Sequence, residues 1–311
     1  MLLDIYEKYN ADSGCKERWN RWKPHRDQIN TILVKQVFSG GRLKDAVILG
    51  AGRCEDIDLK FFLEHVELIT LVDYDLDSMV KALERQHLTE DEKSRIVLIG
   101  DIEFTGFYKE EFVNSITKYM ESKENLEIVR ERIQEHLDNV KSDLFGALGN
   151  QQYGLVVSGA VHSQLIVPFF DLISMDQEYS ELKSQISTIA NRLAGNYNED
   201  LLDLVQEDGW LFSYFDVMEL SEQNNALRYE PIISALIREN EDDKIENIMA
   251  QFGGVAGARY GFENLLERTI KYEPYQKSWI WYFRENKKYY VRSLCVCKHI
   301  AQNRIQKMLK I

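Results

Sequence analysis

The sequence has few cysteines, a shortage of positive charge and no long apolar run. Four cysteines in 311 residues are too few for a disulfide framework, so we expect free thiols in a reducing compartment. The 38 basic residues are outnumbered by 51 acidic ones, which gives a formal net charge of −13. This deficit argues against a broad binding surface for duplex nucleic acid or anionic lipid, because both of these partners are negatively charged.

No run of about eighteen apolar residues occurs, so the sequence predicts no membrane-spanning helix. The first residues, MLLDIYEKYN, are acidic and lack the layout of a signal peptide. We therefore expect a soluble, cytoplasmic protein without a membrane partner. A chain of 311 residues is long enough for one large α/β domain with additions, and the sequence leaves its oligomeric state open.

One stretch, residues 44–75, contains most of the residues that indicate ligand binding. An apolar run ends at Gly50-Ala51-Gly52, a helical stretch follows, and a second apolar run ends at Asp73. This order predicts a strand, a glycine turn, a helix and a second strand. Glycines let the backbone approach a ligand closely, and an acid that ends the second strand can accept hydrogen bonds from both hydroxyls of a ribose. The stretch is typical of a site for a nucleotide-like ligand.

Further apolar runs continue this pattern along the chain. We expect a third strand over 95–99, a fourth over 153–158 and a fifth over 210–215, each separated from the next by helical stretches. Sequential strands joined in this way pair in parallel with right-handed crossovers. Two β-rich runs, 279–284 and 289–298, share a short polar link and predict a terminal antiparallel hairpin. The sequence therefore predicts an α/β fold.

Two segments fall outside the alternating pattern. Residues 1–43 combine tryptophans and basic residues with an apolar-periodic stretch, and they predict a helical N-terminal extension before a domain of residues 44–311. This extension either covers a ligand or packs on the core through Trp19 and Trp22. Residues near 109–148 are highly charged and predict a helical insertion that lies beside the sheet or covers the site.

The ordered strands, the glycine turn, the acids after the second and third strands and the terminal hairpin together resemble the class I S-adenosylmethionine-dependent methyltransferases. The resemblance covers roughly residues 44–299. It implies a doubly wound, mostly parallel sheet of about seven strands with an antiparallel C-terminal hairpin. It also implies S-adenosyl-L-methionine as the cofactor and a small-molecule, peptide or protein side chain as the methyl acceptor.

The resemblance implies a role for each residue that matches the family's motifs. The glycine turn would approach the methionine part of the cofactor, Asp73 would hold the ribose, and Asp101 would bind the adenine amino group. The adenine ring would lie against Tyr74 and Ile102, and the end of the fourth strand would lie beside the sulfonium. The implied cofactor-binding residues are Gly50, Ala51, Gly52, Asp73, Tyr74, Asp101, Ile102, Ser158 and Gly159.

The sequence departs from the family's pattern at two positions. Ile48 stands where the family usually has an acid that holds the amino group of the cofactor, and Cys54 stands where a third glycine is usual. Asp56 or Asp58, just after the turn, could substitute for the missing acid. The fourth strand also lacks the Asn/Asp-Pro-Pro-Tyr signature of amino methylation on nucleic-acid bases, which argues against a base methyltransferase.

Two sets of residues have a catalytic or metal interpretation beside a structural one. His162 follows the fourth strand, where a general base could take a proton from the acceptor, although a histidine before an apolar run is as often structural. Cys295, Cys297 and His299 alternate along the last strand, but a buried strand face explains the cysteines without a metal. We therefore expect no metal site.

Two other functions could use the same strand, glycine turn, helix and second strand of residues 44–75. A catalytically silent cofactor-binding or scaffold protein of this fold would keep the motifs without turnover, with the charged insertion as its partner surface. An NAD(P)-dependent oxidoreductase would need a third glycine at position 55, where Glu55 would place a negative charge beside the pyrophosphate. The methyltransferase is the leading interpretation.

Overall fold

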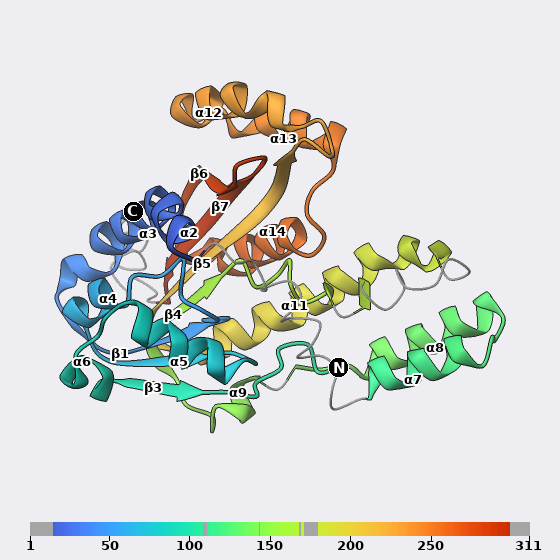
Figure 1. Cartoon of the computed structure of the whole chain (residues 1–311), viewed down its shortest axis with the longest axis horizontal. Coiled ribbons are helices and arrows are strands. Elements are labelled where there is room, and N and C mark those ends of the chain that lie inside the picture. Colours follow the sequence, from blue (N-terminus) through green and yellow to red (C-terminus); the bar gives the residue numbers. More distant parts are fainter. Residues whose placement is uncertain (1–14, 108–110, 143, 168, 171–179, 299–311) are drawn as a thin grey trace, which may run out of the picture.

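The computed structural model of the chain describes residues 15–107, 111–142, 144–167, 169–170 and 180–298 (Figure 1). Its centre is a sheet of seven strands in the order β3-β2-β1-β4-β5-β7-β6. The strands are β1 (Leu43–Leu49), β2 (Val66–Val72), β3 (Ile96–Ile99), β4 (Tyr153–Gly159), β5 (Val205–Ser221), β6 (Tyr275–Arg284) and β7 (Lys287–Cys297). The first five strands pair in parallel, and β7 pairs antiparallel with both β5 and β6. The expected fold class is confirmed.

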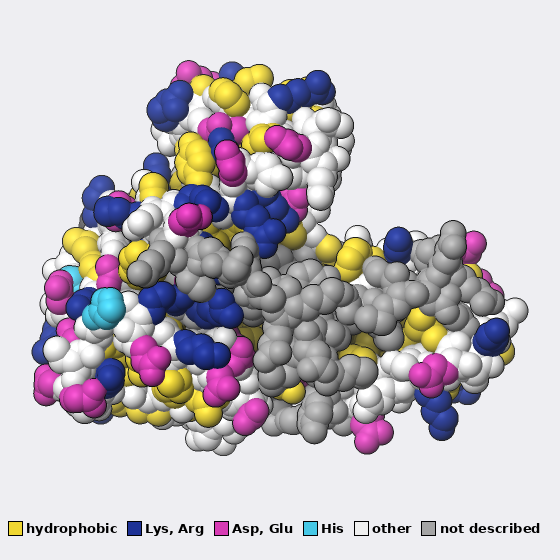
Figure 2. Space-filling model, viewed as in Figure 1, with side chains coloured by type: hydrophobic (Ala, Val, Ile, Leu, Met, Phe, Trp, Pro, Cys, Tyr) yellow, Lys and Arg dark blue, Asp and Glu magenta, His cyan; other side chains and the backbone are white. Residues whose placement is uncertain are grey.

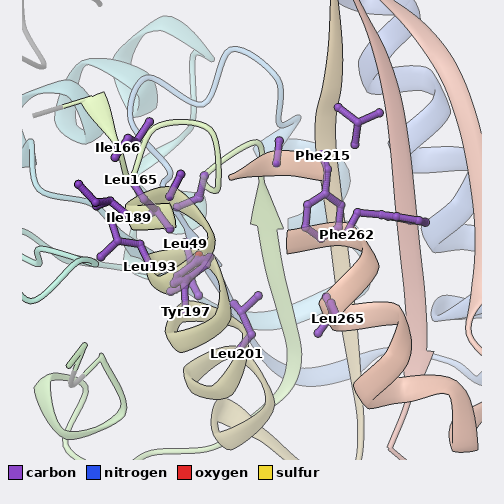
Figure 3. Close-up of a cluster of buried hydrophobic side chains, with 14 of the residues drawn as sticks. Leu49, Leu165, Ile166, Ile189, Leu193, Tyr197, Leu201, Phe215, Phe262 and Leu265 are labelled. Carbon is purple, nitrogen blue, oxygen red and sulfur yellow. The ribbon is translucent and has the colours of Figure 1, made fainter. Parts of the chain in front are cut away.

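Helices cover both faces of the sheet, because each central strand sends alternate side chains into two separate cores. On β1, Val47 and Leu49 belong to one core, whereas Ala46 and Ile48 belong to the other. Burial on both faces explains why this strand is an uninterrupted apolar run. The first core is covered by α11 (Ile186–Leu204) and α14 (Ala258–Thr269), whose side chains point toward the sheet in Figure 3. The second core is covered by α3 (Lys23–Gln36), α4 (Leu59–His65) and α5 (Leu76–Arg85).

The fifth strand differs from its prediction in length. We expected it over residues 210–215, but β5 spans Val205–Ser221. Its first part pairs in parallel with β4, and its last residues continue to pair with β7 after β4 has ended. The residues before 210, which a turn-like Asp-Gly pair marks in the sequence, form an irregular part of the strand, where the register shifts between Tyr153 and Leu155 of β4. The tertiary pairing with β7 therefore decides where this strand ends.

Two helical segments project from the body of the fold in Figure 1. The pair α7 (Phe112–Glu121) and α8 (Leu126–Asn139) lies to one side, with its apolar faces in the first core and charged pairs such as Arg130 with Glu127 outside. The pair α12 (Glu230–Glu239) and α13 (Asp242–Phe252) lies beyond the far end of β5. The shorter elements are α6 (Glu90–Ser94), α9 (Leu144–Ala147), and the 3-10 helices η1 (Phe38–Gly40), η2 (Ser180–Gln185), η3 (Leu227–Tyr229) and η4 (Ile270–Tyr272).

The helices before β1 pack against the C-terminal hairpin. The described ones are α2 (Cys15–Arg21) and α3, and Trp22 lies between them. The indole Nε1 of Trp22 donates a hydrogen bond to the backbone oxygen of Phe283 at 2.9 Å, and the same ring meets Trp281 edge-on. The sequence separation of 261 residues shows that this contact ties the two ends of the described chain together. Residues 1–14 of the expected extension lie outside the described residues.

Three predictions concern features that the sequence lacks: a membrane-spanning helix, a metal site and disulfide bonds. In the described part of the chain, no helix is long and apolar enough to cross a bilayer, and no three His, Cys, Asp or Glu side chains are grouped as a metal ion would require. The thiols of Cys54, Cys295 and Cys297 are free, and His299 lies outside the described residues. Figure 2 shows acidic and basic side chains mixed on one face of the molecule.

Candidate functional site

The candidate site lies at the carboxyl ends of the parallel strands. In the strand order of this sheet, β1 has β2 on one side and β4 on the other, so the crossover connections diverge between β1 and β4. Ligands of open α/β sheets bind in the crevice at such a switch point, outside the carboxyl ends of the strands. All the predicted site residues follow or end β1, β2, β3 or β4 and therefore share this edge: Gly50, Ala51, Gly52, Asp73, Tyr74, Asp101, Ile102, Ser158, Gly159 and His162.

The glycine turn directly after β1 has the backbone that its sequence predicts. Gly50 and Gly52 have φ values of 67° and 45°, in the left-handed region that glycine adopts without strain. A Cβ atom on Gly50 would lie 2.5 Å from Cγ2 of Val161, so the loop after β4 rests directly on this turn. The turn is further fixed by Ala51, whose amide donates to the backbone oxygen of Val72 at 3.1 Å. The close approach requires glycine at position 50.

Asp73 connects the end of β2 to the glycine turn. Its Oδ2 accepts a hydrogen bond from the amide of Gly52 at 2.9 Å, and its Oδ1 accepts one from the amide of Asp75 at 3.0 Å. Burial raises the pKa of Asp73, and these backbone hydrogen bonds partly offset the shift. The N-cap of α5 is instead Asp75, which accepts from the amide of Ser78 at 2.9 Å. Asp73 is therefore not a capping residue, and the remaining lone pairs of its carboxylate can accept from a ligand.

The loop after β3 lies against the loop after β2. The amide of Asp101 donates to the backbone oxygen of Tyr74 at 3.2 Å, and the amide of Ile102 donates to that of Asp73 at 3.3 Å. Asp101 has a positive φ of 58° and an exposed side chain, whereas Tyr74 and Ile102 pack partly against the first core. The structure therefore brings the two predicted acids into neighbouring loops, with two apolar surfaces beside them.

The end of β4 is in contact with α11 and β5. The hydroxyl of Ser158 lies 3.0 Å from that of Tyr197 on α11, and both residues are fully buried. A Cβ atom on Gly159 would overlap the phenol ring and hydroxyl of Tyr214 on β5. Glycine at position 159 therefore makes room for Tyr214 at the edge where the predicted site lies.

His162 lies in a fully enclosed position on the α11 side of the sheet. Its Nε2 lies 2.8 Å from Oδ1 of Asn198, whose own amide nitrogen donates to the backbone oxygen of Gly261 at 2.9 Å. Burial lowers the pKa of His162 to about 4, so the imidazole is neutral at pH 7. The orientation of Asn198 makes Nε2 of His162 the donor, which leaves Nδ1 as an acceptor. Its role as a general base stays a prediction.

The loop after the glycine turn contains three acids whose roles the sequence left open. Asp58 caps α4 by accepting from the amide of Phe61 at 3.2 Å, so it serves the helix. Asp56 instead accepts a hydrogen bond from the hydroxyl of Tyr214, and burial raises the pKa of Asp56 to about 6. This places Asp56, rather than Asp58, beside Gly159 and the turn.

Glu55 is the third acid, and its environment corrects an argument from the sequence. Its carboxylate is 4 % exposed and forms ion pairs with Arg18 of α2 at 2.7 Å and with Arg85 of α5 at 2.6 Å. Two guanidinium groups therefore balance the charge that we expected to repel a pyrophosphate. The ion pairs instead hold α2, the loop after the turn and α5 together.

The sequence analysis missed Tyr214 as a site residue. It had one usable signal, because β5 contains Tyr214 and Asp216 in the middle of the largely apolar run LFSYFDVMEL. A carboxylate in a strand that is buried on both faces is rare unless it has a partner or a function. Asp216 is that carboxylate, and it is 6 % exposed.

The strand order also identifies the kind of fold. An otherwise parallel sheet in which the last strand, β7, inserts antiparallel between β5 and β6 is the arrangement that the sequence resemblance implies. The chain has the class I methyltransferase fold. The carboxyl ends of β1 to β4 are followed by the glycine turn and both predicted acids.

Comparisons with known proteins give similar structures at low sequence identity. No family model matches the sequence, and a search of curated proteins found no match. The N-methyltransferase NodS from Bradyrhizobium japonicum WM9, in complex with S-adenosyl-L-homocysteine, is 10 % identical over 92 % of this chain and 99 % of its own, with a TM-score of 0.38. Magnesium protoporphyrin IX methyltransferase (ChlM) from Synechocystis PCC 6803 is 12 % identical over 95 % and 99 %, with a TM-score of 0.41. The description of the fold rests on the strand order of the chain itself.

Proposed function

We propose that this protein is an S-adenosylmethionine-dependent methyltransferase that acts on a small molecule or on a peptide or protein side chain. The observation that carries the proposal is the meeting of the glycine turn with Asp73 at the switch point of the sheet. The amide of Gly52 and the carboxylate of Asp73 lie 2.9 Å apart there, and Asp101 follows in the adjacent loop. This donor and acceptor set fits a nucleoside that carries an amino-acid tail.

The residues present fit each part of the cofactor. Asp73 would accept from the ribose hydroxyls, and Asp101 would accept from the adenine amino group, with Tyr74 and Ile102 against the ring. The turn at Gly50 would admit the methionine part, because its backbone has no side chain in the way. The bound cofactor would supply an electrophilic methyl group on a sulfonium.

Asp56 is the acid that we assign to the amino group of the cofactor. The family's usual acid is replaced by Ile48, which is 1 % exposed and packs in the second core. Asp56 lies after the same turn, and the Tyr214 hydroxyl holds its carboxylate beside Gly159. A carboxylate in this position would pair with an ammonium by a charge-assisted hydrogen bond. Ser158 and Gly159 at the end of β4 would then lie beside the sulfonium.

Methyl transfer requires mainly that the acceptor be held in line with the methyl group and that water be kept away. The helices before β1 and the α7–α8 pair flank the edge of the sheet and would supply the acceptor side, in keeping with a division at residue 43 and an insertion near 109–148. Neither segment contains a sequence motif. Specificity in a widely used fold depends on such additions rather than on the common core.

Calorimetric titration of the full chain with S-adenosyl-L-homocysteine tests the proposal. We expect Asp73→Asn to weaken binding by about tenfold or more, because a charge-assisted hydrogen bond contributes at least that factor. Asp77→Asn changes an exposed acid in the first turn of α5 and should leave affinity unchanged. Undetectable binding to the folded wild-type protein, or wild-type affinity in Asp73→Asn, would contradict the proposal. Binding without methylation of any acceptor would favour a silent cofactor-binding protein.

A further inference from the structure

The side chain of Tyr214 crosses the end of a neighbouring strand. Leu49, the last residue of β1, is in register with Ser158 of β4. The next residue of β4, Gly159, is in register with Tyr214 of β5. A Cβ atom on Gly159 would overlap the phenol ring, so the ring lies in the space that a side chain at position 159 would fill. The hydroxyl therefore reaches past β4 toward the loop after β1, where it donates to Oδ2 of Asp56.

An aromatic cluster that joins α3, β5 and β6 holds the ring of Tyr214. The cluster consists of His25 of α3, Tyr214 of β5, and Trp279 and Trp281 of β6, all at most 6 % exposed. His25 meets the Tyr214 ring edge-on, with centroids 5.1 Å apart, and stacks on Trp281 at 4.2 Å. Trp279 donates from its Nε1 to Nδ1 of His25 at 2.9 Å. Because these buried rings pack closely, the Tyr214 hydroxyl has a fixed position.

The hydrogen bond joins a buried donor to a carboxylate that a ligand can reach. Tyr214 is fully buried, whereas Asp56 is partly exposed. The hydroxyl contacts one carboxylate oxygen, so the other oxygen keeps lone pairs for a ligand. Burial and the negative charge of Asp56 raise the pKa of Tyr214 well above its ordinary value, so the phenol remains a donor near neutral pH. A donor in this place favours the ionised form of the carboxylate.

We propose, resting on the proposed methyltransferase function, that Tyr214 is a positioning residue whose hydroxyl holds Asp56 ionised against the ammonium group of the cofactor. Gly159 is the opening through which the hydroxyl reaches Asp56, and the aromatic cluster keeps it there. Tyr214 acts only through Asp56. Protonation of Asp56 removes the charge that pairs with the ammonium, so cofactor binding weakens as the pH falls.

The surroundings of Asp56 make Tyr214 the group that most favours its ionisation. Burial raises the pKa of Asp56 to about 6, and the hydrogen bond from Tyr214 opposes this shift. The other side chains that act on Asp56 are Glu55 and Cys54 of the same loop and Arg26 of α3. Arg26 donates to the backbone oxygen of Glu55 at 2.6 Å. Removal of the Tyr214 hydroxyl should therefore raise the pKa of Asp56.

The test measures binding of S-adenosyl-L-homocysteine to the full chain by calorimetry between pH 5 and pH 8. The wild type should bind about tenfold more weakly at pH 5 than at pH 7, because Asp56 is protonated over this range. Tyr214→Phe keeps the ring and removes the hydroxyl. It should weaken binding at pH 7 by about tenfold and move the loss of affinity to higher pH.

Asp56→Asn is the second variant, and it keeps an acceptor for Tyr214 while removing the charge. It should weaken binding at pH 7 by about tenfold or more and make the affinity depend less on pH. Burial also raises the pKa of Asp73, but Asp73 is present in every variant, so the difference from the wild type isolates Asp56. In Asp56→Asn, adding Tyr214→Phe should change the affinity by less than about twofold, because Tyr214 acts through the charge of Asp56.

Tyr290→Phe is the matched control. Tyr290 is 1 % exposed, and its hydroxyl donates to Asp242 of α13 at 3.1 Å, so this variant also removes a buried hydrogen bond from tyrosine to aspartate. It should bind S-adenosyl-L-homocysteine as the wild type does.

The inference and the proposed function fail in different ways. The wild-type affinity and pH profile in Tyr214→Phe, the wild-type profile in Asp56→Asn, an equal loss from Tyr214→Phe in both backgrounds, or an equal loss in Tyr290→Phe would overturn the inference alone. Undetectable binding to the folded wild-type protein would instead overturn the proposed function and the inference with it.

Discussion

Two neighbouring halves of the molecule, the proposed cofactor site and the aromatic cluster of β5 and β6, are built in different ways. The cofactor half, at the ends of β1, β2 and β3, consists of short loops in which Gly52, Asp73 and Asp101 are fixed by backbone hydrogen bonds to near neighbours. The second region, the aromatic cluster at β5 and β6, is assembled by side chains far apart in sequence, such as Trp279 and His25, which are separated by 254 residues. The first half is partly open to solvent, whereas the second is buried.

This difference explains why the two halves carry different kinds of sequence signal. A loop that binds a ligand through its backbone needs particular residues at particular spacings, and such spacings appear in the sequence as a motif. A buried cluster needs only that its side chains be complementary after folding. The halves meet at Gly159, where the end of β4 contacts Tyr214, and at the loop that contains Glu55 and Asp56.

The largest effect is expected from breaking the ion pairs of Glu55, which hold the N-terminal helices against the cofactor half. Glu55→Gln should lower the free energy of unfolding by about 4 kcal/mol, because it removes the partner of buried guanidinium groups. Glu127→Gln on α8 breaks an exposed ion pair with Arg130 and should cost less than about 0.5 kcal/mol. Urea unfolding of both variants measures the difference. Equally small losses of stability in both variants would show that the ion pairs of Glu55 do not hold the N-terminal helices against the cofactor half.

An intermediate effect is expected from substituting His162. The experiment distinguishes a structural role of this residue from a catalytic one. Its pKa is about 4 in the folded protein and near 6.5 when unfolded, so its contribution to stability is fully present above pH 6.5 and is lost as the pH falls toward 4. The loss attributable to His162 is about 3 kcal/mol. The free energy of unfolding of His162→Gln should therefore depend less steeply on pH than that of the wild type.

The matched comparison for this experiment is His136→Gln on α8, which should follow the wild-type profile because His136 is only partly buried. A His162→Gln protein with the wild-type pH dependence would show that the imidazole titrates normally. In that case His162 would be available as a general base near neutral pH.

The smallest effect is expected at Gly159, where the two halves touch. Gly159→Ala places a methyl group against Tyr214 and should lower stability by about 2 kcal/mol, as overpacking of a core does. Adding Tyr214→Ala should make the combined effect smaller than the sum of the two single changes, because the second substitution removes the clash. Gly40→Ala is the control, since a Cβ atom there meets nothing within 4 Å. Additive changes at 159 and 214 would show that the halves are not coupled at this point.

Much of the cofactor half follows from the sequence. The apolar runs, the turn at Gly50 and the acid at Asp73 predict the strands and their order along the chain, since each depends on local periodicity or on a backbone conformation that few residues adopt. The extent of β5 could not be predicted, because pairing with β7 continues the strand beyond its contact with β4. The neutralisation of the Glu55 charge could not be predicted either, because its partners Arg18 and Arg85 lie in helices distant in sequence.

The sequence by itself determined the α/β class, the glycine turn and the two acids that follow β2 and β3, because these features act through neighbours along the chain. The tertiary structure alone decided that Asp56 faces Tyr214 rather than capping a helix, that His162 is enclosed, and that Asp216 is buried. The physical reason is that burial and charge pairing depend on what the fold brings near a side chain, and a strand or helix pattern does not specify that partner.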